Sequence, residues 1–302
     1  MRMQHPRQYF ALPILLALTT SAARADHPPA YPVVEPPAEL KEALDLAPSY
    51  RNFIDCCGFP VLGSEKVSDH AMREAAYLID RMLEGRDDIR RAMAENKVRF
   101  VVMAPSEMTT DVPEHSDLTP KRYWDRRARG LGATRARPAV SCGEENLLRL
   151  PGDPYAAENI LVHEFSHAIH EMGLREVGED FDGRLRRAYE QAKAEGLWEG
   201  TYAATNPNEY WAEGVQSWFD TNRPPDGSHN HVDTREELKE YDPRLAALIA
   251  EVFGDRPWRY VRPEDREPSE RAHLAGFDRS RAAPFAWPAA SEEGGGEDGD
   301  RP

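Results

Sequence analysis

The chain has 302 residues, of which 40% are hydrophobic and 30% are charged, and its formal net charge is -15. This composition allows a sizeable core and excludes a wholly disordered chain. The acidic balance argues against nucleic acid as a partner, because like charges would repel the phosphate backbone.

The first 25 residues have the pattern of a secretory signal peptide. A basic start is followed by an apolar run from Phe10 to Leu18 and by a small-residue site that ends at Ala25. We therefore predict a secreted or periplasmic protein whose mature chain has a formal net charge of -18, because cleavage removes three arginines and no acid. No later run reaches the roughly 18 apolar residues of a membrane span, so no membrane association is expected after cleavage.

Composition divides the processed chain into three parts. Residues 26–48 are rich in proline and are interpreted as an extended lead-in. Residues 49–287 carry the patterned elements and are expected to form one folded domain. The acidic, glycine-rich tail 288–302 is predicted to be disordered, because it cannot bury apolar area.

The first half of the domain is expected to hold helices and a small sheet. Apolar spacing predicts a helix from Ser68 to Leu83, with Gly85 ending it, and a second short helix that ends near Met93. The β-branched and aromatic run Val98–Met103 is the clearest strand. One or two further strands are expected between residues 108 and 150.

The second half is expected to be mainly helical, because one start signal occurs three times. In each case a capping Asp or Asn precedes a proline at the first helical position. The order of elements predicts an α+β fold, with the small sheet before these helices. The helices expected are 154–172 with Gly173 as its stop, 182–195, 207–220 and 243–253.

The chemistry is concentrated in His163-Glu164-Phe165-Ser166-His167 on the first of these helices. Residues four apart lie on one helical face, about 6 Å apart along the axis, so both imidazoles can reach one metal ion. Glu164 lies beside that face, where it can take a proton from a water that zinc has made acidic. The pattern therefore predicts a catalytic Zn²⁺ site with Glu164 as its general base.

A catalytic zinc normally has a third protein ligand. His170 is expected to pack or to support the site instead, because it lies seven residues beyond His163, about 10.5 Å along the axis. A metzincin would need glycine at position 170 and histidine at 173, so that class is excluded. Glu209 and Glu213 lie one turn apart on an aromatic-rich helix, and one of them can bind zinc while the other orients a ligand.

The pairing of the His-Glu-x-x-His motif with Tyr202, Glu209, two aromatic residues, an alanine and Glu213 resembles the gluzincin metallopeptidases of the lethal-factor-like and Pro-Pro endopeptidase group. The resemblance spans roughly residues 98–225 and is sharp only in these two motifs. It implies a zincin-like catalytic domain over 49–287, with Glu209 as the third zinc ligand and Glu213 supporting a ligand. It also implies that Tyr202 steadies the oxyanion of the transition state.

We therefore expect an exported zinc metallopeptidase that hydrolyses peptide or protein substrates. Two alternatives remain open on the sequence: a zinc amidohydrolase that acts on a non-peptide substrate, and an exported binding protein that keeps the scaffold without turnover. Glu164 and Tyr202 favour the enzyme, because a scaffold without turnover does not need them.

Other polar groups have weaker patterns. Residues 229–231, His-Asn-His, are interpreted as a solvated turn or an extra substrate contact, and Glu144 and Glu145 as surface charge or part of a substrate-binding segment. The basic run of Arg126, Arg127 and Arg129 is expected to be a solvated loop.

Export permits a disulfide in this chain. Cys142 could bridge to Cys56 or to Cys57, and three unbridged cysteines fit the sequence equally well. Spacing alone does not fix the connectivity.

Overall fold

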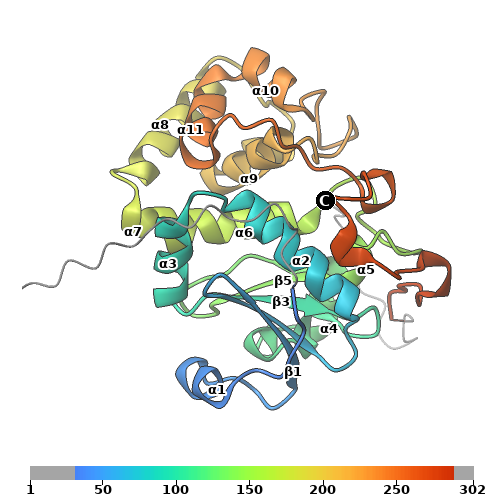
Figure 1. Cartoon of the computed structure of the whole chain (residues 1–302). Coiled ribbons are helices and arrows are strands. Elements are labelled where there is room, and N and C mark those ends of the chain that lie inside the picture. The colour runs from blue at the N-terminus through green and yellow to red at the C-terminus, as the bar shows by residue number, and fades with distance from the viewer. Residues whose placement is uncertain (1–30, 289–302) are drawn as a thin grey trace, which may run out of the picture.

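The computed structural model describes residues 31–288, so the predicted signal peptide and all but the first residue of the predicted tail lie outside the described residues. The described part is a mixed α+β structure with one five-stranded sheet (Figure 1). No described helix combines the length and the apolar character that crossing a membrane requires.

The sheet is built from two hairpin-like edges and a parallel centre. Its strand order is β1-β2-β3-β5-β4; the outer pairs β1/β2 and β4/β5 are antiparallel, and the inner pairs β2/β3 and β3/β5 are parallel. The short strand β4 therefore forms one edge of the sheet. The strands are β1 (Tyr50–Cys56), β2 (Phe59–Ser64), β3 (Arg99–Met103), β4 (Gly130–Leu131) and β5 (Ala139–Gly143).

Most helices lie on one side of the sheet, with α6 between the sheet and α9 (Figure 1). The helices of the first half are α1 (Ala38–Leu44), α2 (Asp69–Met82), α3 (Asp87–Glu95), α4 (Lys121–Arg127) and α5 (Glu144–Leu147). Those of the second half are α6 (Ile160–Ala168), the π-helix η3 (Ile169–Leu174), α7 (Arg175–Val177), α8 (Phe181–Ala194), the 3-10 turn η4 (Tyr202–Ala204), α9 (Pro207–Trp218), α10 (Arg235–Tyr241) and α11 (Pro243–Phe253).

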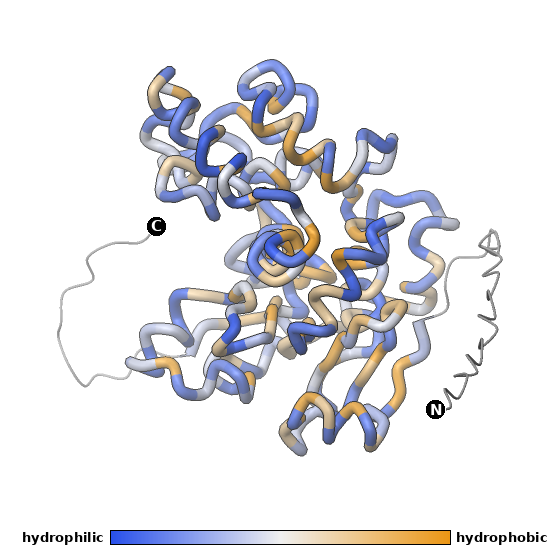
Figure 2. The backbone as a smooth tube through the Cα atoms, turned by 90° about the vertical axis from the view of Figure 1, so that its left-hand side faces the viewer, coloured by the Kyte–Doolittle hydropathy of each residue, from blue (hydrophilic) through white to orange (hydrophobic). Residues whose placement is uncertain are grey.

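Strand alternation divides the apolar side chains between two cores. Phe100 and Val102 of β3 face the large core under the helices, while Val101 and Met103 face a smaller cluster on the other side. This is the period of two expected when both faces of a strand are covered. Figure 2 shows the same pattern, with hydrophobic stretches along the strands and through the middle of the molecule and hydrophilic residues in the outer turns.

Several predicted elements are confirmed. The helix expected from Ser68 is α2, and the Ser68 hydroxyl accepts a hydrogen bond from the Ala71 amide as its cap. Asn206 and Asp242 cap α9 and α11 through their side chains, each with proline at the next position. The sheet also contains two strands between residues 108 and 150, where one or two were expected.

The predicted start and stop of the helix that carries the His-Glu-x-x-His motif were wrong. Asp153 accepts a hydrogen bond from the Tyr155 amide and makes a turn, and α6 begins only at Ile160, capped by the Asn159 side chain. Gly173 does not stop the helix, which continues through η3 and α7. A Cβ at Gly173 would lie 2.8 Å from Ile89 Cγ2, so this glycine allows α3 to pack closely.

Candidate metal centre

Two facing helices carry the predicted site. Helix α6 supplies His163, Glu164 and His167, and α9 supplies Glu209. The indole Nε1 of Trp211 on α9 donates to the Ser166 carbonyl on α6 at 2.9 Å, which fixes the two helices to each other. The predicted residues, 46 positions apart in sequence, therefore lie on two elements joined by a buried contact.

The three predicted metal ligands converge. His163 Nε2 lies 3.2 Å from Glu209 Oε2 and 3.2 Å from His167 Nε2, and His167 Nε2 lies 3.3 Å from Glu209 Oε2. Four tetrahedral ligands about 2.0 Å from zinc would be separated by about 3.3 Å. The three atoms thus have the spacing of one face of such a tetrahedron.

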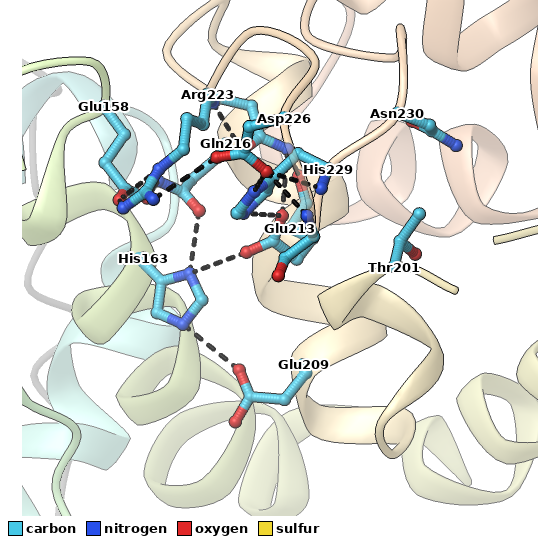
Figure 3. A network of polar contacts seen from close by, with 12 residues as sticks. Glu158, His163, Thr201, Glu209, Glu213, Gln216, Arg223, Asp226, His229 and Asn230 are labelled. Carbon is cyan, nitrogen blue, oxygen red and sulfur yellow. Dashed lines mark hydrogen bonds and ion pairs between the residues drawn. The ribbon is translucent and has the colours of Figure 1, made fainter. Parts of the chain in front are cut away.

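The hydrogen bonds behind His163 show which of its ring nitrogens faces the other ligands as an acceptor (Figure 3). Gln216 Nε2 donates to the Glu158 carboxylate at 3.1 Å, so its Oε1 is directed at His163 Nδ1, 2.7 Å away. An amide oxygen only accepts, so Nδ1 carries the proton and a neutral His163 has its lone pair on Nε2. This donor set fits a metal ion, because a cation is required between lone pairs so close together.

The charges of the surrounding side chains also favour a cation between these ligand atoms. Burial acts to lower the pKa of His163, but Glu209, Glu164 and Glu213 raise it to about 10. Burial acts to raise the pKa of Glu209, but His163 and His167 bring it below its ordinary value. The site therefore strongly favours positive charge next to the Glu209 carboxylate.

Glu164 lies in a different environment. Burial raises its pKa, opposed by His163 and His167 and aided by the Glu209 charge. A carboxyl group with a raised pKa is suited to exchange protons near neutral pH, as a general acid–base residue must.

The edge strand β4 lies directly against this group. A Cβ on Gly130 would come within 3.0 Å of Glu164 Cγ, and one on Gly132 within 3.0 Å of His167 Cβ. Glycine at these two positions allows the chain to pass close to α6. The outer side of β4 pairs with no other described strand.

Tyr202 lies beside the cluster on η4. Its ring centroid is 6.3 Å from that of His163, and its amide donates to the Ser228 carbonyl at 2.8 Å. Burial, Glu209 and Glu164 all raise the pKa of its hydroxyl, so it stays protonated as a hydrogen-bond donor. No residue in the described range accepts a hydrogen bond from this hydroxyl.

Glu213 supports the site less directly than Gln216. Its Oε1 lies 3.5 Å from His163 Nδ1, against 2.7 Å for the Gln216 oxygen. Its other oxygen accepts from Asn222 at 3.2 Å and lies 3.6 Å from His229 Nε2 (Figure 3). His229 also contacts Asp226 at 2.8 Å, so this histidine belongs to the polar network behind the ligands.

Other predicted positions are separate from the cluster. His170 contacts Asp182 at 2.7 Å and packs against Phe181, as expected for a supporting residue. Glu144 and Glu145 are buried, which excludes the surface-charge interpretation. Arg129 is also buried, because its guanidinium pairs with Glu145, so this member of the basic run is not in a solvated loop.

The cysteines form no disulfide in the structure. Cys56 and Cys142 are buried and Cys57 is exposed at the turn between β1 and β2.

Sequence reasoning missed Gln216 and its partner Glu158. Gln216 lies seven residues after Glu209 and three after Glu213, so helical spacing places all three on one face of α9. This helical spacing is the sequence signal that could have identified Gln216 as part of the site. Glu158 precedes α6 in a segment wrongly expected to be helical, so its approach to Gln216 was not foreseen.

Comparisons with known proteins add little beyond this geometry. No protein-family model matches the chain, and no curated protein sequence matches it. Among solved structures, a Pro-Pro endopeptidase from Paenibacillus alvei is similar with a TM-score of 0.39 and 17% sequence identity, over 66% of this chain and 98% of that chain. A TM-score this low does not establish a common fold.

Proposed function

We propose that this chain is an exported zinc-dependent peptidase that hydrolyses peptide bonds. The observation that carries the proposal is the convergence of His163, His167 and Glu209 within 3.3 Å of one another, next to the half-buried side chain of Glu164. The three converging residues would hold the metal. A zinc ion bound there supplies a Lewis acid that polarises a carbonyl group and lowers the pKa of water.

The residues of this chain then have distinct tasks. Glu164 takes a proton from the attacking water and later gives a proton to the leaving amine. Tyr202 donates its free hydroxyl hydrogen to the oxygen that becomes negative in the transition state. Gln216 keeps the proton on Nδ1 of His163, so that Nε2 remains a ligand atom.

The edge strand gives a reason to favour an extended peptide as substrate. Strand β4 pairs only with β5 among the described strands; Gly130 in the strand lies against Glu164, and Gly132 just after it lies against His167. An extended peptide can add to such an edge through main-chain hydrogen bonds. This arrangement would bring a peptide carbonyl close to the ligand cluster.

The test is cleavage of a diverse peptide mixture by the zinc-loaded mature chain, read by mass spectrometry. The matched control is Glu164→Gln, which keeps the size of the side chain and removes its base. New termini that appear with the unmodified chain and not with the control are expected. Cleavage patterns would also reveal the preferred residues around the scissile bond.

Negative outcomes distinguish the alternatives. If zinc is bound and no peptide is cut, the peptidase proposal fails, and small amide substrates become the next assay. If Glu164→Gln cuts as well as the unmodified chain, the proposed mechanism is wrong.

A further inference from the structure

The segment that leads into the edge strand is the basic part of an acidic protein. Residues 121–137 contain seven lysines or arginines and one acid, whereas the whole chain has a formal net charge of -15. The segment includes α4 and β4, and β4 lies against the active-site helix. Its charge is therefore concentrated on one side of the candidate site.

Most cations of this segment are neutralised by other parts of the protein. Arg126 and Arg127 differ, because no carboxylate in the described range forms an ion pair with either guanidinium. Both side chains are exposed. The neutralised members and their partners are Lys121 with Asp111, Arg129 with Glu145, Arg135 with Glu176 and Arg137 with Asp117.

Arg127 is held close to the site by its backbone. Its carbonyl accepts a hydrogen bond from the Tyr155 hydroxyl at 2.7 Å. Gly130, which packs on Glu164, follows three residues later, a distance of about 10 Å at most for an extended chain. The backbone of Arg127 is thus fixed beside the strand that borders Glu164.

The Arg127 side chain packs on a neighbouring aromatic ring. Its guanidinium lies over the Trp124 ring, 5.9 Å from the centroid. Burial, Glu209 and Glu164 raise the pKa of Tyr202, while the charge of Arg127 opposes them.

We propose that the Arg127 guanidinium, exposed beside β4, binds a carboxylate of the peptide substrate close to the scissile bond. This inference rests on the proposed peptidase function. The candidate site contains the carboxyl groups of Glu164 and Glu209, so a substrate carboxylate that binds near them needs a cation beside it. The planar fork of arginine matches a carboxylate with two parallel hydrogen bonds. The carboxylate can belong to an Asp or Glu side chain or to the C-terminus of the substrate.

The test measures binding as well as cleavage. Three peptide pools are compared: one with Asp and Glu, one with Asn and Gln at the same positions, both amidated at the C-terminus, and one neutral pool with a free C-terminus. Zinc-loaded Glu164→Gln protein captures peptides from an equal mixture, and mass spectrometry gives the enrichment of each pool. Arg127→Gln is added to this background, with Arg126→Gln as the matched control at the neighbouring exposed arginine.

We expect one carboxylate pool to be enriched about tenfold over the Asn/Gln pool, the size of one charge-assisted hydrogen bond. Enrichment of the acidic pool identifies a side-chain carboxylate, and enrichment of the free-terminus pool identifies the C-terminus. The enrichment of the preferred carboxylate pool over the Asn/Gln pool should fall to near one in Arg127→Gln and stay unchanged in Arg126→Gln. Arg127→Glu should favour peptides with lysine or arginine over the acidic pool.

Equal retention of all three pools, including no retention of any, would overturn the inference, as would a preference that survives Arg127→Gln. The protein with Glu164 intact reports separately on the proposed function. A carboxylate preference without any cleavage would contradict the peptidase proposal and leave the assignment of Arg127 standing. Cleavage without a carboxylate preference would support the peptidase proposal and overturn the assignment of Arg127.

Discussion

Two clusters of this protein, one buried and one partly exposed, combine glutamate with histidine, and they differ in how their charge is balanced. In the first cluster, Glu74 accepts two hydrogen bonds from Arg266, at 2.6 and 2.8 Å, and contacts His273 Nε2 at 2.7 Å. In the second, Glu209 faces His163 and His167, and no lysine or arginine of residues 31–288 contacts its carboxylate.

The difference separates a cluster that is neutralised within the chain from the cluster that we propose as a metal site. Glu74 is fully buried, and burial acts to raise its pKa, but Arg266 and His273 together bring the pKa below its ordinary value. That cluster joins α2 to the irregular segment after α11 and is complete within the chain. The Glu209 cluster instead directs three lone pairs to one point, which suits a metal ion. Variants of the Glu74 cluster should change the stability of the protein, and variants of the Glu209 cluster should change metal binding or turnover.

The largest effect is expected for Glu74→Gln, with a loss of about 4 kcal/mol in the free energy of unfolding. Removing one partner leaves Arg266 buried without its counter-charge. Denaturant titration measures the loss, and zinc content of the folded fraction should not change. Because the folded pKa of Glu74 is lowered, its contribution is present above the unfolded pKa and is lost as the pH falls through the folded value.

The difference in stability between the unmodified chain and Glu74→Gln should therefore shrink in acid. A loss below about 1 kcal/mol at neutral pH would contradict the structural role, given the usual cost of a broken buried pair.

A smaller effect, on turnover, is expected for Tyr202→Phe. Losing one preorganised donor to a developing negative charge costs about 10² to 10³ in kcat, roughly 3 kcal/mol. Zinc content and stability should stay close to those of the unmodified chain. Kinetics on a cleaved peptide measure the loss, and Tyr123→Phe, at an exposed tyrosine, serves as the control. Equal kcat values in the two variants would remove Tyr202 from the mechanism.

The smallest effect is expected for Gln216→Met, which keeps the side-chain volume and removes the acceptor for His163 Nδ1. Loss of a group that orients a ligand typically weakens metal affinity about 10- to 100-fold, roughly 2 kcal/mol. Competition with a zinc chelator measures the affinity, and Gln191→Met on the exposed face of α8 is the control. Unchanged affinity would show that Glu213 or the backbone alone orients His163.

Local signals explain which parts of the fold the sequence predicts. Caps such as Asn206 and Asp242 act within three residues, so they are readable without knowledge of the tertiary structure. Asp153 shows the same pattern and fails, because its carboxylate bonds to the amide two residues on and to the Asn146 side chain. Tertiary contacts thus decided between a turn and a helix.

The candidate site also has features set by local sequence and features set by tertiary contacts. The spacing of His163 and His167 on a helix is a local property, whereas the role of Gln216 depends on how α9 faces α6. The hairpin β1/β2 and helix α4 were not predicted, although the turn of the hairpin, at Cys57 and Gly58, is a local feature. Arg129 was misjudged because its partner Glu145 lies 16 residues away.

The most direct test of the account is the zinc content of Glu209→Gln, measured by elemental analysis beside the unmodified mature chain and Glu74→Gln. The account predicts one zinc per folded chain in the unmodified protein and in Glu74→Gln, and loss of stoichiometric zinc in a folded Glu209→Gln. Full zinc occupancy in Glu209→Gln, or no zinc uptake by the unmodified chain, would contradict the assignment of the metal centre.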